Sequence, residues 1–67
     1  MTFECLVHAV DDECVECEAH EVNSSNPVEF AEVYLSTFPA DIRPLLVEGA
    51  VFYWWFESGE SQIMVRG

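Results

Sequence analysis

Residues 2–22, TFECLVHAVDDECVECEAHEV, decide the fold, because apolar and polar side chains alternate along them on both sides of an acidic centre. A period of two is typical of half-buried β-strands. With residues 11–13 as the loop and Val10 opposite Cys14, the stretch predicts a β-hairpin with two distinct faces. The apolar face collects Phe3, Cys5, Val7, Ala9, Val15, Cys17 and Ala19. The mixed face collects Glu4, Leu6, His8, Val10, Cys14, Glu16, Glu18 and His20.

Residues 28–35 fit two structures. A helix over 27–38 would have Asn26 as its N-cap and Pro27 at its first position. A strand would alternate instead, with Glu32 outward between apolar inward positions. Those inward positions are Ala31, Val33 and Leu35. We expect the strand and keep the helix, which would make the fold α+β, as the alternative.

The remaining sequence adds two strands. Two prolines within residues 38–46 prevent a regular strand there, so we expect a short helical turn near 40–42 and then an irregular link. Residues 50–57, AVFYWWFE, form the strongest strand in the chain. A turn at 58–60 then leads into a last strand at 62–66. The fold class expected is mainly β: one domain over 1–67, built as a small five-stranded SH3-like or OB-like barrel.

The acidic composition excludes several classes of function. Thirteen Asp and Glu stand against two Arg and no Lys in 67 residues, for a formal net charge of −11. Direct nucleic-acid binding through phosphates is excluded by this charge, and anionic membrane surfaces would repel the chain. No positively charged segment precedes an apolar run near residue 1, so we expect a cytoplasmic protein. We expect no cofactor.

The second half of the chain carries a recognisable frame. It consists of Leu35-Ser36, Pro39, Asp41 and Leu46, followed by Gly49-Ala50-Val51-Phe52-Tyr53-Trp54. This frame resembles that of small bacterial proteins of unknown function that end in a Gly-Ala-x-Phe-Tyr-Trp strand. The resemblance implies that the segment before Leu35 is a strand, and it implies no catalytic residue.

Zinc binding is one alternative function. Cys14, Cys17 and His20, with either Cys5 or His8, are residue types that tetrahedral zinc accepts. Positions three apart on a strand point to opposite faces, however, so Cys14 and Cys17 should diverge. We therefore expect no metal site, with Cys5 and Cys17 serving as small core residues.

Catalysis is not expected either. Cys14 and His8 share the mixed face of the hairpin, but Glu16 and Glu18 lie on the same face. Neighbouring carboxylates raise the pKa of a thiol and so oppose the thiolate that nucleophilic catalysis needs. The many carboxylates are better explained as a solvated acidic face, and we predict no catalytic residue.

The acidic hairpin suggests a basic protein as the partner. Alternate strand positions space carboxylates by about 6–7 Å, close to the phosphate spacing along one DNA strand. We expect a non-enzymatic interaction module that binds a basic, nucleic-acid-binding protein, as an inhibitor, an antitoxin or a nucleic-acid mimic would. The residues expected to bind this partner are Glu4, Asp11, Asp12, Glu13, Glu16, Glu18, Tyr53 and Trp55. A structural protein that forms a homodimer through Tyr53 and Trp55 is the other alternative.

Overall fold

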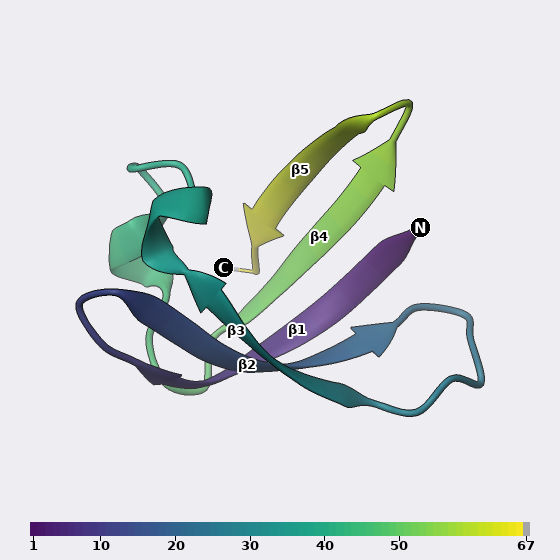
Figure 1. The fold of residues 1–67 in the computed structure, drawn as a ribbon, viewed down its shortest axis with the longest axis horizontal. Coiled ribbons are helices and arrows are strands. Elements are labelled where there is room, and N and C mark those ends of the chain that lie inside the picture. Colours follow the sequence, from purple (N-terminus) through teal and green to yellow (C-terminus); the bar gives the residue numbers. More distant parts are fainter. Residues whose placement is uncertain (67) are drawn as a thin grey trace.

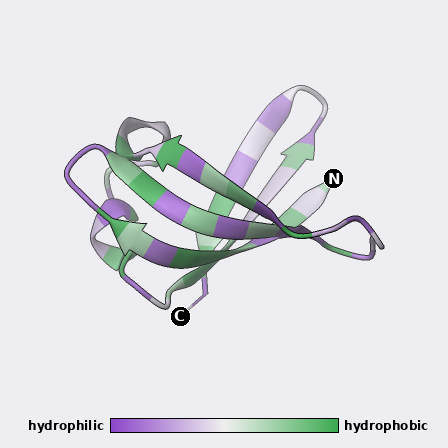
Figure 2. Ribbon diagram, turned by 60° about the horizontal axis from the view of Figure 1, so that its bottom comes forward, coloured by the Kyte–Doolittle hydropathy of each residue, from purple (hydrophilic) through white to green (hydrophobic). Residues whose placement is uncertain are grey.

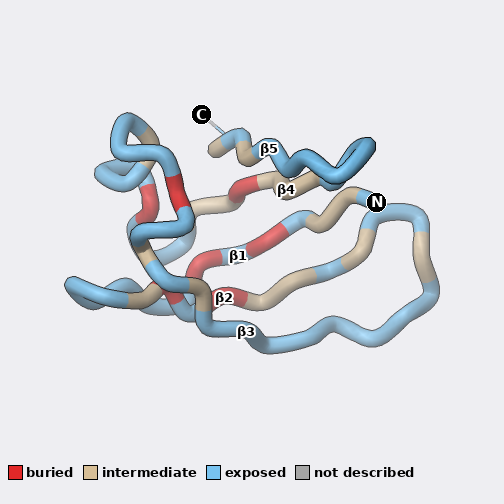
Figure 3. The backbone as a smooth tube through the Cα atoms, turned by 45° about the horizontal axis from the view of Figure 1, so that its top comes forward, coloured by how far each residue is buried: buried red, intermediate tan, exposed pale blue. Residues whose placement is uncertain are grey.

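The fold is one five-stranded antiparallel sheet, seen in a computed structural model that describes residues 1–66. The strands are β1 (Thr2–Val10), β2 (Cys14–Glu21), β3 (Glu29–Tyr34), β4 (Val51–Glu57) and β5 (Glu60–Val65). Their order across the sheet is β3-β2-β1-β4-β5, and the sheet is strongly twisted and bent (Figures 1 and 3). The prediction of a mainly β protein with five strands is confirmed.

The first hairpin has the predicted register over most of its length. Cys5 lies opposite Ala19 and Val7 opposite Cys17, as the alternation requires. Beyond Val7 a β-bulge at His8 shifts the pairing by one residue, so that Ala9 lies opposite Glu16. The prediction that Val10 pairs with Cys14 is therefore wrong, because Val10 pairs with Val15. The same bulge turns Ala9 away from the core, where the sequence had predicted it.

The segment after the first hairpin is a strand and not a helix. β3 pairs antiparallel with β2, with Val33 opposite Val15 and Glu32 opposite Glu16. The α+β alternative with a helix at 27–38 is therefore wrong. Strand pairing to β2 lets the apolar side chains of β3 share a face with Val15, and the first helical turn appears only after the strand ends.

A short link packs against one face of the sheet. Between β3 and β4 run two 3-10 helices, η1 (Leu35–Thr37) and η2 (Arg43–Leu45). A helical turn was predicted near 40–42, where the structure has a turn closed by the bond from Ile42 N–H to the Pro39 carbonyl; η2 follows it at 43–45, and η1 was not predicted. The link places Phe38 and Leu46 on the sheet, where they are almost fully buried. The buried core consists of Cys5, Val7, Val15, Cys17, Phe38, Leu46 and Phe52.

The two faces of the sheet follow from the alternation, which is visible as hydrophilic and hydrophobic residues succeeding each other along the ribbon (Figure 2). We call the side covered by the link the inner face. We call the opposite side the outer face. It carries Glu4, Leu6 and His8 of β1, Cys14, Glu16, Glu18 and His20 of β2, Phe30, Glu32 and Tyr34 of β3, Val51, Tyr53, Trp55 and Glu57 of β4, and Glu60, Gln62 and Met64 of β5.

The last hairpin is tighter than predicted. Its turn consists of Ser58 and Gly59 alone, with φ of 51° and 80°, which is the pattern of a type I′ turn. Glu57 and Glu60 already pair across it, so β5 begins at Glu60 rather than at the predicted residue 62.

The sheet is open. β3 and β5 form its two edges on opposite sides of the molecule, and within residues 1–66 they do not pair with each other (Figure 3). Closure into a barrel is thus not part of the observed hydrogen-bonded sheet.

Candidate functional site: the outer face and the hairpin tip

The outer face unites the two groups of residues that the sequence proposed for partner binding. β1 pairs with β4, with Glu4 opposite Tyr53 and Thr2 opposite Trp55. Glu16 and Glu18 lie on the neighbouring strand β2, on the same side of the sheet. The remaining three proposed residues, Asp11, Asp12 and Glu13, form the exposed tip between β1 and β2. Five of the eight residues thus share one surface, and three lie at its end.

Carboxylates lie directly opposite each other at two places on the outer face: Glu57 and Glu60 beside the last turn, and Glu16 and Glu32 beside the first hairpin. Glu16 of β2 pairs with Glu32 of β3, and both side chains are exposed. Like charges at such a position destabilise a sheet. Within residues 1–66 a single side-chain contact has the geometry of an ion pair, between His8 Nε2 and Glu18 Oε2 at 3.2 Å, and it is ionic only when His8 is protonated. Glu16 and Glu32 therefore have no cationic side chain as a partner.

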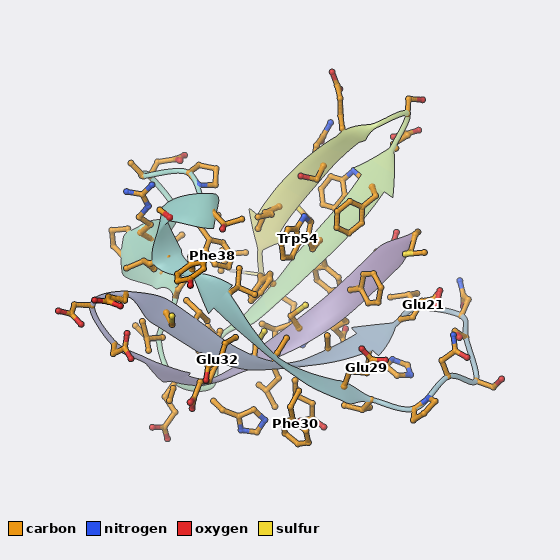
Figure 4. The ribbon with its side chains drawn as sticks, in the orientation of Figure 1. Glu21, Glu29, Phe30, Glu32, Phe38 and Trp54 are labelled. Carbon is orange, nitrogen blue, oxygen red and sulfur yellow. The ribbon has the colours of Figure 1, made fainter. Side chains whose placement is uncertain are left out.

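A shallow groove of about 490 Å³ lies beside this pair. The side chains of His8, Glu16, Phe30 and Glu32 line it. Phe30 is 78% exposed and points away from the core residues Phe38 and Trp54 (Figure 4). Its ring centroid lies 5.7 Å from that of His8. An exposed aromatic ring beside two unpaired carboxylates suits a cationic side chain, which gains from the ring and from the carboxylates.

One of the three tip acids has a structural role. Asp11 Oδ1 accepts hydrogen bonds from the backbone N–H groups of Cys14 at 2.7 Å and Glu13 at 2.8 Å. These two bonds lower the pKa of the Asp11 carboxyl group below its ordinary value. Asp12 and Glu13 are exposed at the same tip. Asp11 thus shapes the loop, and Asp12 and Glu13 are the tip residues that face solvent.

Glu4 takes part in a cross-strand network that the sequence did not predict. The hydroxyl of Tyr53 donates to Glu4 Oε2 at 2.9 Å and accepts from Arg66 Nη1 at 3.2 Å. Tyr53 and Trp55 are both half-buried. The β1–β4 pairing that assembles this network joins residues almost fifty positions apart, and no local sequence signal specifies it.

The outer face also carries exposed apolar side chains that the sequence analysis missed. Phe30 and Tyr34 on β3 are 78% and 68% exposed, and Met64 on β5 is 55% exposed. All three are strand residues in the alternating pattern. Their positions along the strand could have located them. Each lies two residues from an outward acid or amide of the same strand, and side chains two apart point to the same face.

The cysteines and histidines do not converge on a metal. Cys5 and Cys17 are buried on the inner face, whereas Cys14 lies on the outer face. In the part of the chain that the structure describes, no three His, Cys, Asp or Glu side chains are arranged to hold a metal ion. The donor set Cys14, Cys17 and His20, with either Cys5 or His8, is divided between the two faces of the sheet.

The surroundings of two cysteines raise the pKa of their thiols. Desolvation raises the pKa of Cys14, and the nearby carboxylates of Asp11, Glu32, Glu13 and Glu16 raise it further. A hydrogen bond with Cys17, followed by burial, raises the pKa of Cys5. Neither Cys14 nor Cys5 is therefore a thiolate at neutral pH, and the field around Cys14 is negative.

The inner face holds one buried donor without a partner. Trp54 Nε1 is enclosed and has no hydrogen bond among the described residues. The indole stacks on Phe56 at a centroid distance of 5.4 Å and contacts Phe38 at 6.3 Å. These aromatic contacts fix the ring at the margin of the core, and they account for its position without a polar partner.

Comparison of the chain with protein-family models, curated proteins and solved structures finds no match. Among residues 1–66, no helix has the length and apolar character needed to cross a membrane.

Proposed function

We propose that this chain is a non-enzymatic interaction module that binds a basic protein through the acidic part of its outer face and the hairpin tip. The observation that carries the proposal is the Glu16–Glu32 pair beside the groove that Phe30 lines, in which two exposed carboxylates face each other without a cation. Such a pair costs stability in the free protein. A Lys or Arg side chain from a partner would remove that repulsion on binding.

The groove beside the pair supports the same partner chemistry. A guanidinium or ammonium group that enters it meets the Glu16 and Glu32 carboxylates and the ring of Phe30. Asp12 and Glu13 extend the negative surface to the tip. A row of carboxylates of this kind suits a protein whose own surface binds nucleic-acid phosphates, so the module would act as an inhibitor, an antitoxin or a nucleic-acid mimic.

We propose that the open sheet is a small, partly closed barrel. The strand order β3-β2-β1-β4-β5, with the link between β3 and β4, is compatible with a partly open OB-like barrel. The SH3-like alternative expected from the sequence would serve the same role as a small rigid scaffold. In either description the sheet holds the acidic side chains at fixed spacings, which pre-organises them for a basic surface.

The experiment is a binding titration with the partner recovered by the wild-type chain from a native lysate and then purified. Glu16→Gln with Glu32→Gln should weaken binding by roughly two- to tenfold, because exposed ion pairs contribute little each. Asp41→Asn with Glu48→Gln is the matched control, since both carboxylates are exposed in the link between β3 and β4; it removes the same charge away from the outer face and should change affinity less. Reversal of Glu16 and Glu18 to Lys should slow association.

Salt dependence is the second readout of the same titration. Binding through unpaired carboxylates should weaken as salt rises, and the Glu16→Gln and Glu32→Gln variant should show a shallower dependence. An affinity that responds neither to salt nor to the Glu16 and Glu32 substitutions would show that the acidic face serves solubility alone.

A further inference from the structure

The two edge strands of the sheet differ in how they are protected against pairing with another strand. An edge strand exposes unpaired backbone groups, and proteins commonly block such edges with charged side chains. β3 carries Glu29 and Glu32 among its six residues. β5 carries its single acid, Glu60, at its first position, and residues 61–65 are uncharged. β5 is therefore the less protected edge.

The direction of the backbone groups on β5 follows from its last hydrogen bond. The N–H of Arg66 donates to the carbonyl of Val51 on β4 at 2.8 Å. Backbone groups alternate in direction along a strand, so those of Gln62 and Met64 also point to β4. The backbone groups of Ser61, Ile63 and Val65 therefore point to the free edge. Three residues in phase present both a donor and an acceptor to an incoming strand.

We propose that β5 pairs antiparallel with β5 of a second copy of this chain, in the register that places Ile63 opposite Ile63. This register sets Glu60 opposite Arg66 of the second copy, and the two-fold symmetry forms that pair twice. Registers centred on Ser61 or Val65 place no charged residue opposite one of opposite sign. Only the Ile63-centred register lets the two charged residues that flank this strand attract each other.

The same test applied to β3 gives the opposite result. The N–H of Leu35 donates to the carbonyl of Glu13 at 2.7 Å, so the backbone groups of Phe30, Glu32 and Tyr34 point to that free edge. The central register for self-pairing of β3 would place Glu32 opposite Glu32 of the second copy. Two identical carboxylates would meet on the symmetry axis, which disfavours this edge as a dimer contact.

The distribution of charge over the sheet also favours β5. Each chain carries a net charge of −11, so two copies repel each other. The Glu16–Glu32 pair lies on β2 and β3, at the opposite side of the strand order from β5. Of the Glu57–Glu60 pair beside the last turn, Glu60 is the residue that meets Arg66 of the second copy. Pairing through β5 forms a ten-stranded sheet whose acidic edges lie at its two far ends. The acidic outer face of each copy stays accessible, so this inference does not depend on the proposed partner.

The experiment is sedimentation equilibrium of the full chain alone, at about 0.15 M salt, where screening leaves short-range pairs effective. The wild-type chain should dimerise at concentrations up to about 1 mM. Glu60→Arg should weaken the dimer by roughly tenfold, although it reduces the net repulsion, because it opposes Arg66 of the second copy. Adding Arg66→Glu to that variant should restore the dimer by reversing both partners.

A backbone variant tests the edge independently. Ser61 is exposed, and Ser61→Pro removes an N–H that points to the free edge and leaves the β4–β5 bonds in place. It should abolish the dimer, whereas Ser61→Ala should leave it unchanged. Thermal unfolding of each variant checks that the fold is retained. If Ser61→Pro does not fold, the dimerisation of Glu60→Arg, alone and with Arg66→Glu, tests the proposal instead. A monomeric wild-type chain, or a dimer indifferent to both Glu60→Arg and Ser61→Pro, overturns the proposal.

Discussion

The hairpins β1–β2 and β4–β5 connect neighbouring strands with different turn chemistry. In β1–β2, three residues form the loop, and an ionised side chain, that of Asp11, binds two backbone N–H groups. In β4–β5, two residues with positive φ reverse the chain through backbone conformation alone. The first hairpin also carries seven of the thirteen acids, whereas the second supplies Phe52 and the aromatic contacts of the core.

This difference separates stability from the proposed function. Phe52 packs edge-on against Phe38 with a centroid distance of 5.3 Å and is fully buried. Glu16 and Glu32, which would meet the partner, add repulsion between β2 and β3 and contribute no core contact. Substitutions in β4 should therefore change the free energy of unfolding, and substitutions at the outer acids should change binding.

The largest expected effect is that of Phe52→Ala. Truncation of a fully buried Phe costs about 3–5 kcal/mol. For a small domain this is most of the available stability, so we expect a largely unfolded chain. Phe30→Ala is the matched control on the edge strand, where the ring is 78% exposed, and should change stability by about 0.5 kcal/mol or less. Urea denaturation of both variants measures the difference, and equal losses would contradict the separation of the two regions.

Thiol labelling should distinguish the two faces of the first hairpin. Cys14 lies partly exposed on the outer face, whereas Cys5 and Cys17 are each 2% exposed. We expect Cys14 to react at least about tenfold faster, because the buried thiols react only after local opening. Glu32→Gln should accelerate labelling of Cys14 at neutral pH by removing one of the carboxylates that raise its pKa. Mass spectrometry of the labelled peptides gives the rates, and similar rates at all three thiols would contradict the assignment of faces.

The sequence predicted the parts of this fold that depend on local alternation. The register from Cys5 to Val7 followed from the need to keep one face apolar, and β3 was placed correctly for the same reason. The bulge at His8 could not be predicted, because residues 8–10 lie near the open end of the sheet, where burial no longer fixes the phase.

The candidate site could be predicted from the sequence only in part, because it depends on strand pairing between distant segments. The acids of the hairpin and the aromatic residues of β4 were both singled out, but nothing in either segment indicates that β1 and β4 are neighbours. The Glu4–Tyr53–Arg66 network therefore emerged only from the structure. Exposure of Phe30 was missed because an aromatic residue in a strand is more often buried.

A smaller effect is expected at the two-residue turn of the β4–β5 hairpin, which reverses the chain through backbone conformation alone. Ser58 adopts a φ of 51°, which costs an ordinary L-residue energy and suits Asn better. Ser58→Asn should stabilise the protein by roughly 0.5–1 kcal/mol. Gly59→Ala should have the opposite sign, and only through its φ of 80°, because a Cβ there would meet nothing within 4 Å. Thermal unfolding measures both, and the same sign for the two variants would contradict a type I′ turn.

The smallest expected effect is a pH dependence confined to the first hairpin. Hydrogen bonds from Cys14 and Glu13 lower the pKa of Asp11 in the folded protein, so its ionised form stabilises the fold. That contribution is complete above the unfolded pKa of about 4 and is lost as the pH falls through the lower folded pKa. Asp11→Asn keeps an acceptor oxygen but not the charge, so it should be less stable than the wild type at neutral pH. The difference in stability between wild type and Asp11→Asn should shrink on acidification.

Asp12→Asn removes a neighbouring exposed charge without these bonds and serves as the control. Urea denaturation from about pH 2 to 7 tests the sign. A difference between wild type and Asp11→Asn that stays constant over this range would show that the loop does not depend on the charge of Asp11, and that both hairpins turn by backbone conformation alone.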